Sequence, residues 1–111
     1  FAEQHRKGIP LTITNDGNQR RDFTYVKDVV NANILAALHS SDLKGESFNI
    51  GNGDNFSVNE VAEMFGGEKH YFKFVLEPFQ TLADNSKAKK VLGWKPEGNL
   101  KEWLTNYIKT L

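Results

Sequence analysis

Two adjacent arginines, Arg20 and Arg21, have the type and the position to bind an anion. A guanidinium group keeps its charge and donates two parallel hydrogen bonds to a phosphate or a carboxylate. The preceding residues 15–18 read Asn-Asp-Gly-Asn, which favours a tight hairpin turn because these residues tolerate positive φ. The alternative is a solvated arginine paired with Asp16 or Asp22, since exposed ion pairs are common and contribute little to stability. The spacing leaves both possibilities open.

No complete set of catalytic residues accompanies these arginines. A lysine four residues after a tyrosine would acidify the phenol, but Tyr25, Tyr71 and Tyr107 all lack that partner. Residues 51–53 read Gly-Asn-Gly between an expected strand and an expected helix, but Phe56 stands where a dinucleotide fingerprint needs its third glycine. We therefore expect a glycine turn here, no catalytic residue, and no cofactor bound by this chain alone.

The composition is that of an ordinary globular protein, and we expect a single domain over residues 1–111. Fourteen basic residues balance 14 acidic ones, and this zero net charge argues against a nucleic-acid partner. The chain has no cysteine and its three histidines are widely spaced, so a metal site has little support. No apolar run approaches a membrane span and no signal-peptide pattern opens the chain, which favours a cytoplasmic location and no membrane partner.

The first half of the chain has clear helix and strand signals. Residues 1–7 resemble the end of a helix stopped by Gly8, and residues 11–14 alternate like a half-buried strand. Residues 23–26 have the aromatic and β-branched content of the returning hairpin strand. A helix is expected over residues 27–39, with its apolar face on Val30, Ile34, Ala37 and Leu38. Because the chain opens on Phe1 and its sole methionine is Met64, we expect a piece of a longer protein.

The second half alternates strands and helices. Strands are expected over residues 46–50 and 70–75. Ser57 and Glu60 form a capping box that begins a helix ending at Gly66. A short helix should follow Asp84 and end at Gly93, and a last helix should begin after Asn99 with Trp103 among its core residues. Together these elements predict a small α/β or α+β unit.

Six stretches, taken in order, resemble one known family. They are Pro-Leu-Thr-Ile at 10–13, Asp-Gly-x-Gln-x-Arg-Asp-Phe-Thr-Tyr-Val at 16–26, Phe-Asn-Ile-Gly at 48–51, Ser-Val-Asn-Glu at 57–60, Thr-Leu-Ala-Asp with Ser-Lys-Ala at 81–88, and Leu-Gly-Trp-Lys-Pro at 92–96. The chain is similar to the C-terminal, substrate-binding portion of the extended short-chain dehydrogenase/reductases. It most resembles NAD-dependent nucleotide-sugar epimerases and dehydratases of the UDP-glucose 4-epimerase kind.

The resemblance implies a division of labour. A Rossmann domain, mostly missing here, would hold NAD and carry the catalytic Ser/Thr, tyrosine and lysine. This chain would bind the nucleotide sugar, a UDP-sugar-like substrate. Arg21 would hold the diphosphate and the strand Leu11, Thr12, Ile13 would lie against the base, with Thr12 offering hydrogen bonds. Glu77 would reach the ribose hydroxyls.

One departure from the family pattern concerns the second phosphate contact. Family members carry Arg-x-Gly-Glu/Asp before the Thr-x-Ala-Asp motif, whereas this chain reads Phe74-Val-Leu-Glu77. The loss of one charge-assisted hydrogen bond costs about 1.5–3 kcal/mol. A free-standing, non-catalytic nucleotide-binding or self-associating module, such as a homo-oligomer, is therefore the alternative to a segment of an enzyme.

Overall fold

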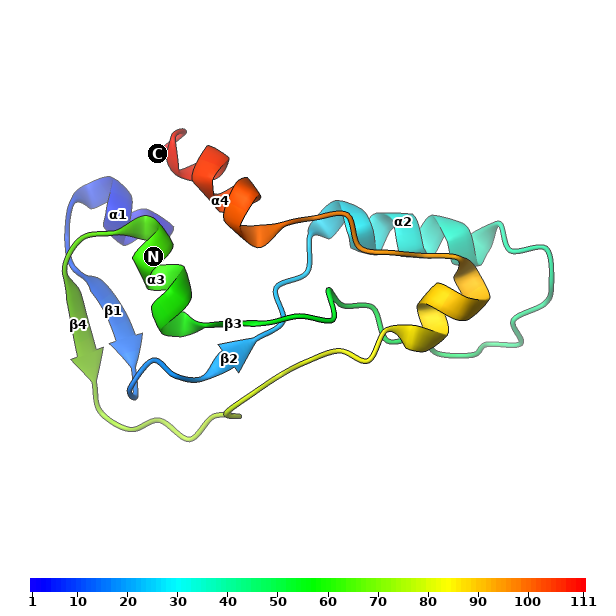
Figure 1. Cartoon of the computed structure of the whole chain (residues 1–111), viewed down its shortest axis with the longest axis horizontal. Coiled ribbons are helices and arrows are strands. Elements are labelled where there is room, and N and C mark those ends of the chain that lie inside the picture. Colours follow the sequence, from blue (N-terminus) through cyan, green and yellow to red (C-terminus); the bar gives the residue numbers. More distant parts are fainter. The chain divides into compact units, whose positions relative to one another are not determined.

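The computed structural model describes residues 1–111 (Figure 1). The sequence predicts one domain, and within it the contacts group into two compact units. Unit 1 comprises Phe1–Arg21, Phe56–Thr81 and Lys101–Leu111, and unit 2 comprises Asp22–Asn55 and Leu82–Leu100.

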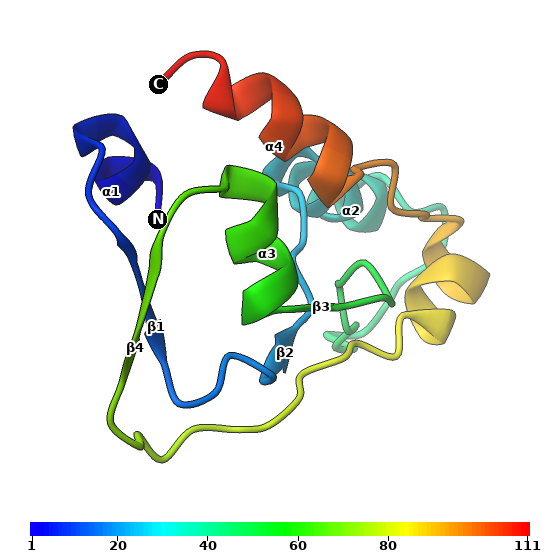
Figure 2. The same cartoon turned by 60° about the vertical axis from the view of Figure 1, so that its left-hand side comes forward.

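Unit 1 contains two short two-stranded sheets. Strand β1 (Leu11–Thr14) pairs in parallel with β4 (Lys69–Phe72), and the two lie side by side in both views (Figures 1 and 2). Strand β2 (Arg20–Arg21) pairs antiparallel with β3 (Phe56–Ser57). Helix α1 (Ala2–Lys7) precedes β1 and ends, as predicted, at Gly8, whose φ of 68° suits a residue without a Cβ.

The predicted hairpin is wrong. Residues 15–17 do turn, with φ of 58° at Asn15 and 76° at Gly17, but residues 23–26 form no strand and do not pair with β1. The backbone partners come from farther along the chain. Arg20 donates its amide to the carbonyl of Phe79 at 2.7 Å and accepts from the amide of Thr81 at 3.1 Å. Partners that distant in sequence leave no local signal.

The core of unit 1 lies between β1 and α3 (Val58–Phe65). Leu11, Ile13 and Ala62 are buried together, and Phe1 and Phe65 pack against them. The rings of Phe1 and Phe65 meet edge to face with their centroids 5.8 Å apart. The predicted capping box is confirmed, because Ser57 Oγ accepts from the Glu60 amide at 3.0 Å while the Glu60 carboxylate accepts from the Ser57 amide at 2.7 Å.

Helix α4 (Leu100–Ile108) ends the chain, and its part from Lys101 onward belongs to unit 1. Leu104 is buried, as the periodicity predicts. Trp103, in contrast, is 44% exposed and stacks on Tyr107 with ring centroids 4.8 Å apart. The prediction that Trp103 lies in the core is therefore wrong.

Unit 2 packs helix α2 (Val26–Ala37) against the short helix η1 (Ala88–Leu92). Trp94 is 1% exposed and anchors this core, where its indole nitrogen donates to the carbonyl of Asp28 at 2.8 Å. Helix η1 ends at Gly93, as predicted, with φ of 64°. The expected strand over residues 46–50 does not form.

The apolar face predicted for α2 is exposed. Val30 and Ile34 are half exposed and Leu38 is 79% exposed, whereas Asp28 and Ala32 on the other side of the helix are buried. Helix α2 therefore carries two apolar faces, of which unit 2 covers the one with Ala32, Leu35 and Ala36. None of the helices in the chain has both the length and the apolar character that a membrane span requires.

Candidate functional site

Arg21, the predicted anion ligand, pairs with Glu77. One terminal nitrogen of Arg21 donates to the carbonyl of Arg20 at 2.7 Å, and the other lies 3.2 Å from Glu77 Oε2. Both side chains are about one quarter exposed, so the pair is partly shielded from water but open to a ligand. The two side chains that the resemblance assigns to diphosphate and ribose thus meet, although 56 residues separate them in sequence.

The second oxygen of Glu77 ties it to the end of β1. Oε1 accepts from Thr14 Oγ1 at 3.2 Å and from Asn15 Nδ2 at 2.9 Å. The Asn15 side chain also bonds both backbone groups of Val75, at 3.0 Å and 2.7 Å. The turn after β1 therefore holds the segment after β4 and places the carboxylate in front of Arg21.

A cavity of about 550 Å³ opens beside this pair. It is lined by Asn15, Asp16, Gln19, Phe72, Phe74, Val75, Glu77 and Phe79. Apolar walls with a few polar groups, at a volume of about 300–1,000 Å³, are typical of small-molecule sites. Gln19 is buried on this wall and donates to the Thr14 carbonyl at 3.0 Å, and its Oε1 is a buried acceptor without a hydrogen-bond partner.

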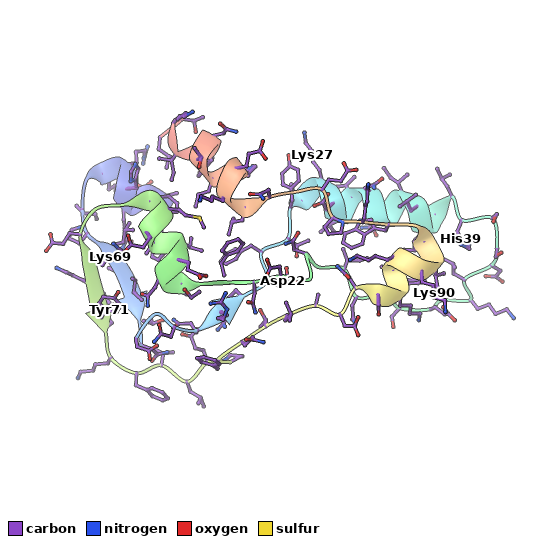
Figure 3. The ribbon with its side chains drawn as sticks, in the orientation of Figure 1. Asp22, Lys27, His39, Lys69, Tyr71 and Lys90 are labelled. Carbon is purple, nitrogen blue, oxygen red and sulfur yellow. The ribbon has the colours of Figure 1, made fainter.

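The sheet of unit 1 has one covered and one open face. On the covered face Tyr71 donates to Asn59 Oδ1 of α3 at 3.0 Å, and Lys69 pairs with Glu63 of the same helix at 3.0 Å (Figure 3). The opposite face carries four exposed residues, two from each strand: Thr12, Thr14, His70 and Phe72. We call these four residues the open face of the sheet.

The predicted base-binding strand divides between these two faces. Leu11 and Ile13 are 2% and 1% exposed, so their side chains belong to the core. Thr12 is exposed, but its polar groups already have a partner. Its amide donates to Gln4 Oε1 at 3.1 Å and its hydroxyl accepts from Gln4 Nε2 at 2.8 Å. A base at Thr12 would have to replace this contact.

Sequence reasoning missed Gln4, Asn15 and Gln19 as members of this region. The alternation of β1 signalled that Thr12 and Thr14 share a face, but nothing local predicts which distant side chains meet them. In the whole chain, no group of three His, Asp or Glu side chains is arranged to hold a metal ion.

Comparisons with known proteins place this arrangement in a family. The profile described as the NAD dependent epimerase/dehydratase family matches residues 1–51. Over 97% of its length the chain is 43% identical to YtcB, an uncharacterized UDP-glucose epimerase of Bacillus subtilis. The chain therefore matches a segment of the NAD-dependent epimerase/dehydratase family. The resemblance inferred from the six stretches is confirmed.

Solved structures of the family share the fold. The UDP-glucuronic acid 4-epimerase of Bacillus cereus, in complex with UDP-glucuronic acid and NAD, matches 98% of this chain with a TM-score of 0.88 and 34% identity. The UDP-glucose 4-epimerase of Thermotoga maritima matches 97% with a TM-score of 0.84 and 33% identity. The expected small mixed α/β unit is thus part of the epimerase fold.

The epimerase/dehydratase relatives are much longer than this chain. It spans 36% of the Bacillus subtilis relative, 38% of the Bacillus cereus enzyme and 36% of the Thermotoga maritima enzyme. The remaining polypeptide of these relatives has no counterpart among the 111 residues.

Proposed function

We propose that this chain is the nucleotide-sugar-binding part of an NAD-dependent epimerase or dehydratase and that it does not catalyse alone. The observation that supports this most is the Arg21–Glu77 pair, which lies at the end of the open face and beside an apolar cavity. An arginine that stays charged suits a diphosphate, and a carboxylate suits ribose hydroxyls.

The order of these groups fits an extended nucleotide. Thr12 and Thr14 lie about 7 Å apart along an extended strand. Glu77 contacts Thr14, and Arg21 contacts Glu77. A base at Thr12, a ribose near Glu77 and a diphosphate at Arg21 would therefore follow one another along the open face. The aromatic cavity beside Glu77 would take a further portion of the ligand.

The test is calorimetric titration of the chain with UDP. We expect Arg21→Ala to weaken binding at least tenfold, which corresponds to about 1.4 kcal/mol. The matched control is Arg6→Ala, because Arg6 pairs only locally with Glu3 on α1 and is more than half exposed. Equal affinities for the unchanged chain and Arg21→Ala, or no binding at millimolar UDP, would refute the proposal.

We further propose that an NAD-binding Rossmann domain covers the exposed face of α2. The Bacillus cereus epimerase carries this same fold in 38% of its chain, and its structure holds NAD. The exposed face has five apolar side chains, namely Val26, Val29, Val30, Ile34 and Leu38. An apolar stripe of this kind on a soluble helix indicates a packing partner.

This docking is testable with the part of the Bacillus subtilis relative that has no counterpart in this chain, used as a separate polypeptide. We expect it to bind this chain, and we expect Ile34→Ser with Leu38→Ser to weaken that binding at least tenfold. The matched control is Lys27→Ser, an exposed change on the same helix that leaves the stripe intact. Concentration-dependent self-association in sedimentation velocity, abolished by the double substitution, would show that a second copy covers the face instead.

A cytoplasmic location stays a prediction.

A further inference from the structure

The side chain of Gln4 caps the free edge of β1. Leu11 donates its amide toward β4, to the carbonyl of Glu68 at 2.8 Å. Successive residues of a strand direct their amides to opposite edges, so the Thr12 amide faces away from β4. Gln4, from the middle of α1, accepts that hydrogen bond at 3.1 Å.

Gln4 and Thr12 exchange two hydrogen bonds, one in each direction. Thr12 offers a donor, its amide, and an acceptor, its hydroxyl oxygen. The primary amide of Gln4 answers with an acceptor at 3.1 Å and a donor at 2.8 Å. Both hydrogen bonds lie at the surface, where a solvent-exposed hydrogen bond contributes little and is readily exchanged.

A nucleobase presents the same pair of groups. The imide edge of uracil places a carbonyl oxygen next to an N–H. The carbonyl oxygen could accept from the Thr12 amide, as Gln4 Oε1 does, and the N–H could donate to the Thr12 hydroxyl, as Gln4 Nε2 does. We infer that Gln4 is an internal stand-in for the base of the ligand, and that base binding at Thr12 displaces it. This inference rests on the proposed nucleotide-binding function and adds to it a residue that sets the affinity for the base.

The short, exposed helix α1 supports the inference that a ligand can displace Gln4 from Thr12. Helix α1 has only six residues and none of them is buried, and the Gln4 side chain makes its two hydrogen bonds to Thr12 alone. The charged residues Glu3, Arg6 and Lys7 of α1 pair with one another. Release of Gln4 therefore breaks no ion pair of the helix.

The first experiment compares UDP and pyrophosphate binding to the chain and to Gln4→Met, which keeps the side-chain length but removes both hydrogen bonds. We expect UDP to bind Gln4→Met about fivefold more tightly, which corresponds to about 1 kcal/mol, because the two exposed hydrogen bonds that compete with the base are gone. Pyrophosphate, which has no base, should bind both proteins equally. Glu3→Gln is the matched control on the same helix, and it should not alter UDP affinity.

Two further readouts separate this inference from a general effect on α1. The diphosphate of 3-methyluridine, whose imide N–H is blocked, should gain nothing from Gln4→Met. In nuclear magnetic resonance spectra of the unchanged chain, UDP should shift the Thr12 amide and the Gln4 side-chain NH₂ signals together. The inference fails if UDP binds through Arg21 while Gln4→Met has no effect, or if the Gln4 signals do not move. Absence of any UDP binding overturns both the proposed function and this inference.

Discussion

Three carboxylates in the two units accept several hydrogen bonds each, but their donors differ. In unit 2, Asp22 accepts from the backbone amides of Asn52, Gly53 and Ala83 at 2.9–3.1 Å (Figure 3). Asp28 accepts from those of Glu97 and Gly98 at 3.1 and 2.8 Å. In unit 1, Glu77 accepts from three side chains, those of Thr14, Asn15 and Arg21.

The identity of the donor decides what such a carboxylate can do. A backbone amide cannot turn away unless its loop unfolds, so Asp22 and Asp28 hold loops in place. Side-chain donors can rotate to other acceptors, so the contacts of Glu77 can be exchanged without loss of the fold. Burial differs as well between Asp28, which is 6% exposed, and the Glu77 side chain, which is 27% exposed, whereas Asp22 is half-buried.

The largest effect should come from Asp28→Ala. The substitution leaves the amides of Glu97 and Gly98 without an acceptor, and we expect the free energy of unfolding to fall by about 3 kcal/mol. Urea denaturation measures this change. Asp28→Asn, which keeps one acceptor, should lose about half as much. A loss no greater than that of Glu77→Ala would break the comparison between the two kinds of carboxylate.

Phe74→Arg should have the next largest effect, on binding. Phe74 is 80% exposed at the cavity and occupies the position where family members carry an arginine, so the longer cation should be accommodated. We expect UDP affinity to rise at least tenfold, since one charge-assisted phosphate hydrogen bond contributes about 1.5–3 kcal/mol. Calorimetry would show this gain, and Leu76→Arg, an exposed position outside the cavity lining, is the control. A similar gain in both variants would indicate only non-specific attraction.

Glu77→Gln should have a smaller effect, on both stability and anion binding, and it tests whether Glu77 differs from Asp28. Glutamine keeps an acceptor for Thr14 and Asn15 but removes the negative charge that faces Arg21. Partly exposed ion pairs contribute about 0.2–1 kcal/mol, so stability should change by less than about 1 kcal/mol and pyrophosphate should bind a few times more tightly. Weaker pyrophosphate binding in parallel with a large loss of stability would assign Glu77 a structural role like that of Asp28.

The smallest effect concerns Asp84, an exposed carboxylate in unit 2 with purely local partners. The hydroxyl and the backbone amide of Ser86 donate to it and lower the pKa of Asp84 below its usual value. A lowered pKa favours the folded state above the ordinary value near 3.8, and that contribution is lost as the pH falls through the folded pKa. Ser86→Ala should raise the pKa of Asp84, as a carboxyl titration by nuclear magnetic resonance would show. An unchanged midpoint would mean that the hydroxyl bond is not formed.

Local chemistry allowed the sequence to predict the helix ends and the capping box. Gly8, Gly93 and the Ser57–Glu60 pair act over three to five residues, so their hydrogen bonds are formed within the same stretch that encodes them. The six family stretches were likewise readable, because their order along the chain is itself sequence information. Arg21 and Glu77 were assigned on that resemblance alone.

Tertiary structure decided which groups meet. Strand β1 pairs with β4, and the backbone of Arg20 bonds Phe79 and Thr81, all more than 50 positions away, so the turn at residues 15–17 could not reveal that no hairpin follows. Periodicity predicted helix α2 but not its buried face, because both faces are apolar. On the buried face Ala32, Leu35 and Ala36 pack with Trp94 and η1, and Val30, Ile34 and Leu38 are left exposed. The packing partner, which lies far away in sequence, rather than hydrophobicity, determined which face is buried.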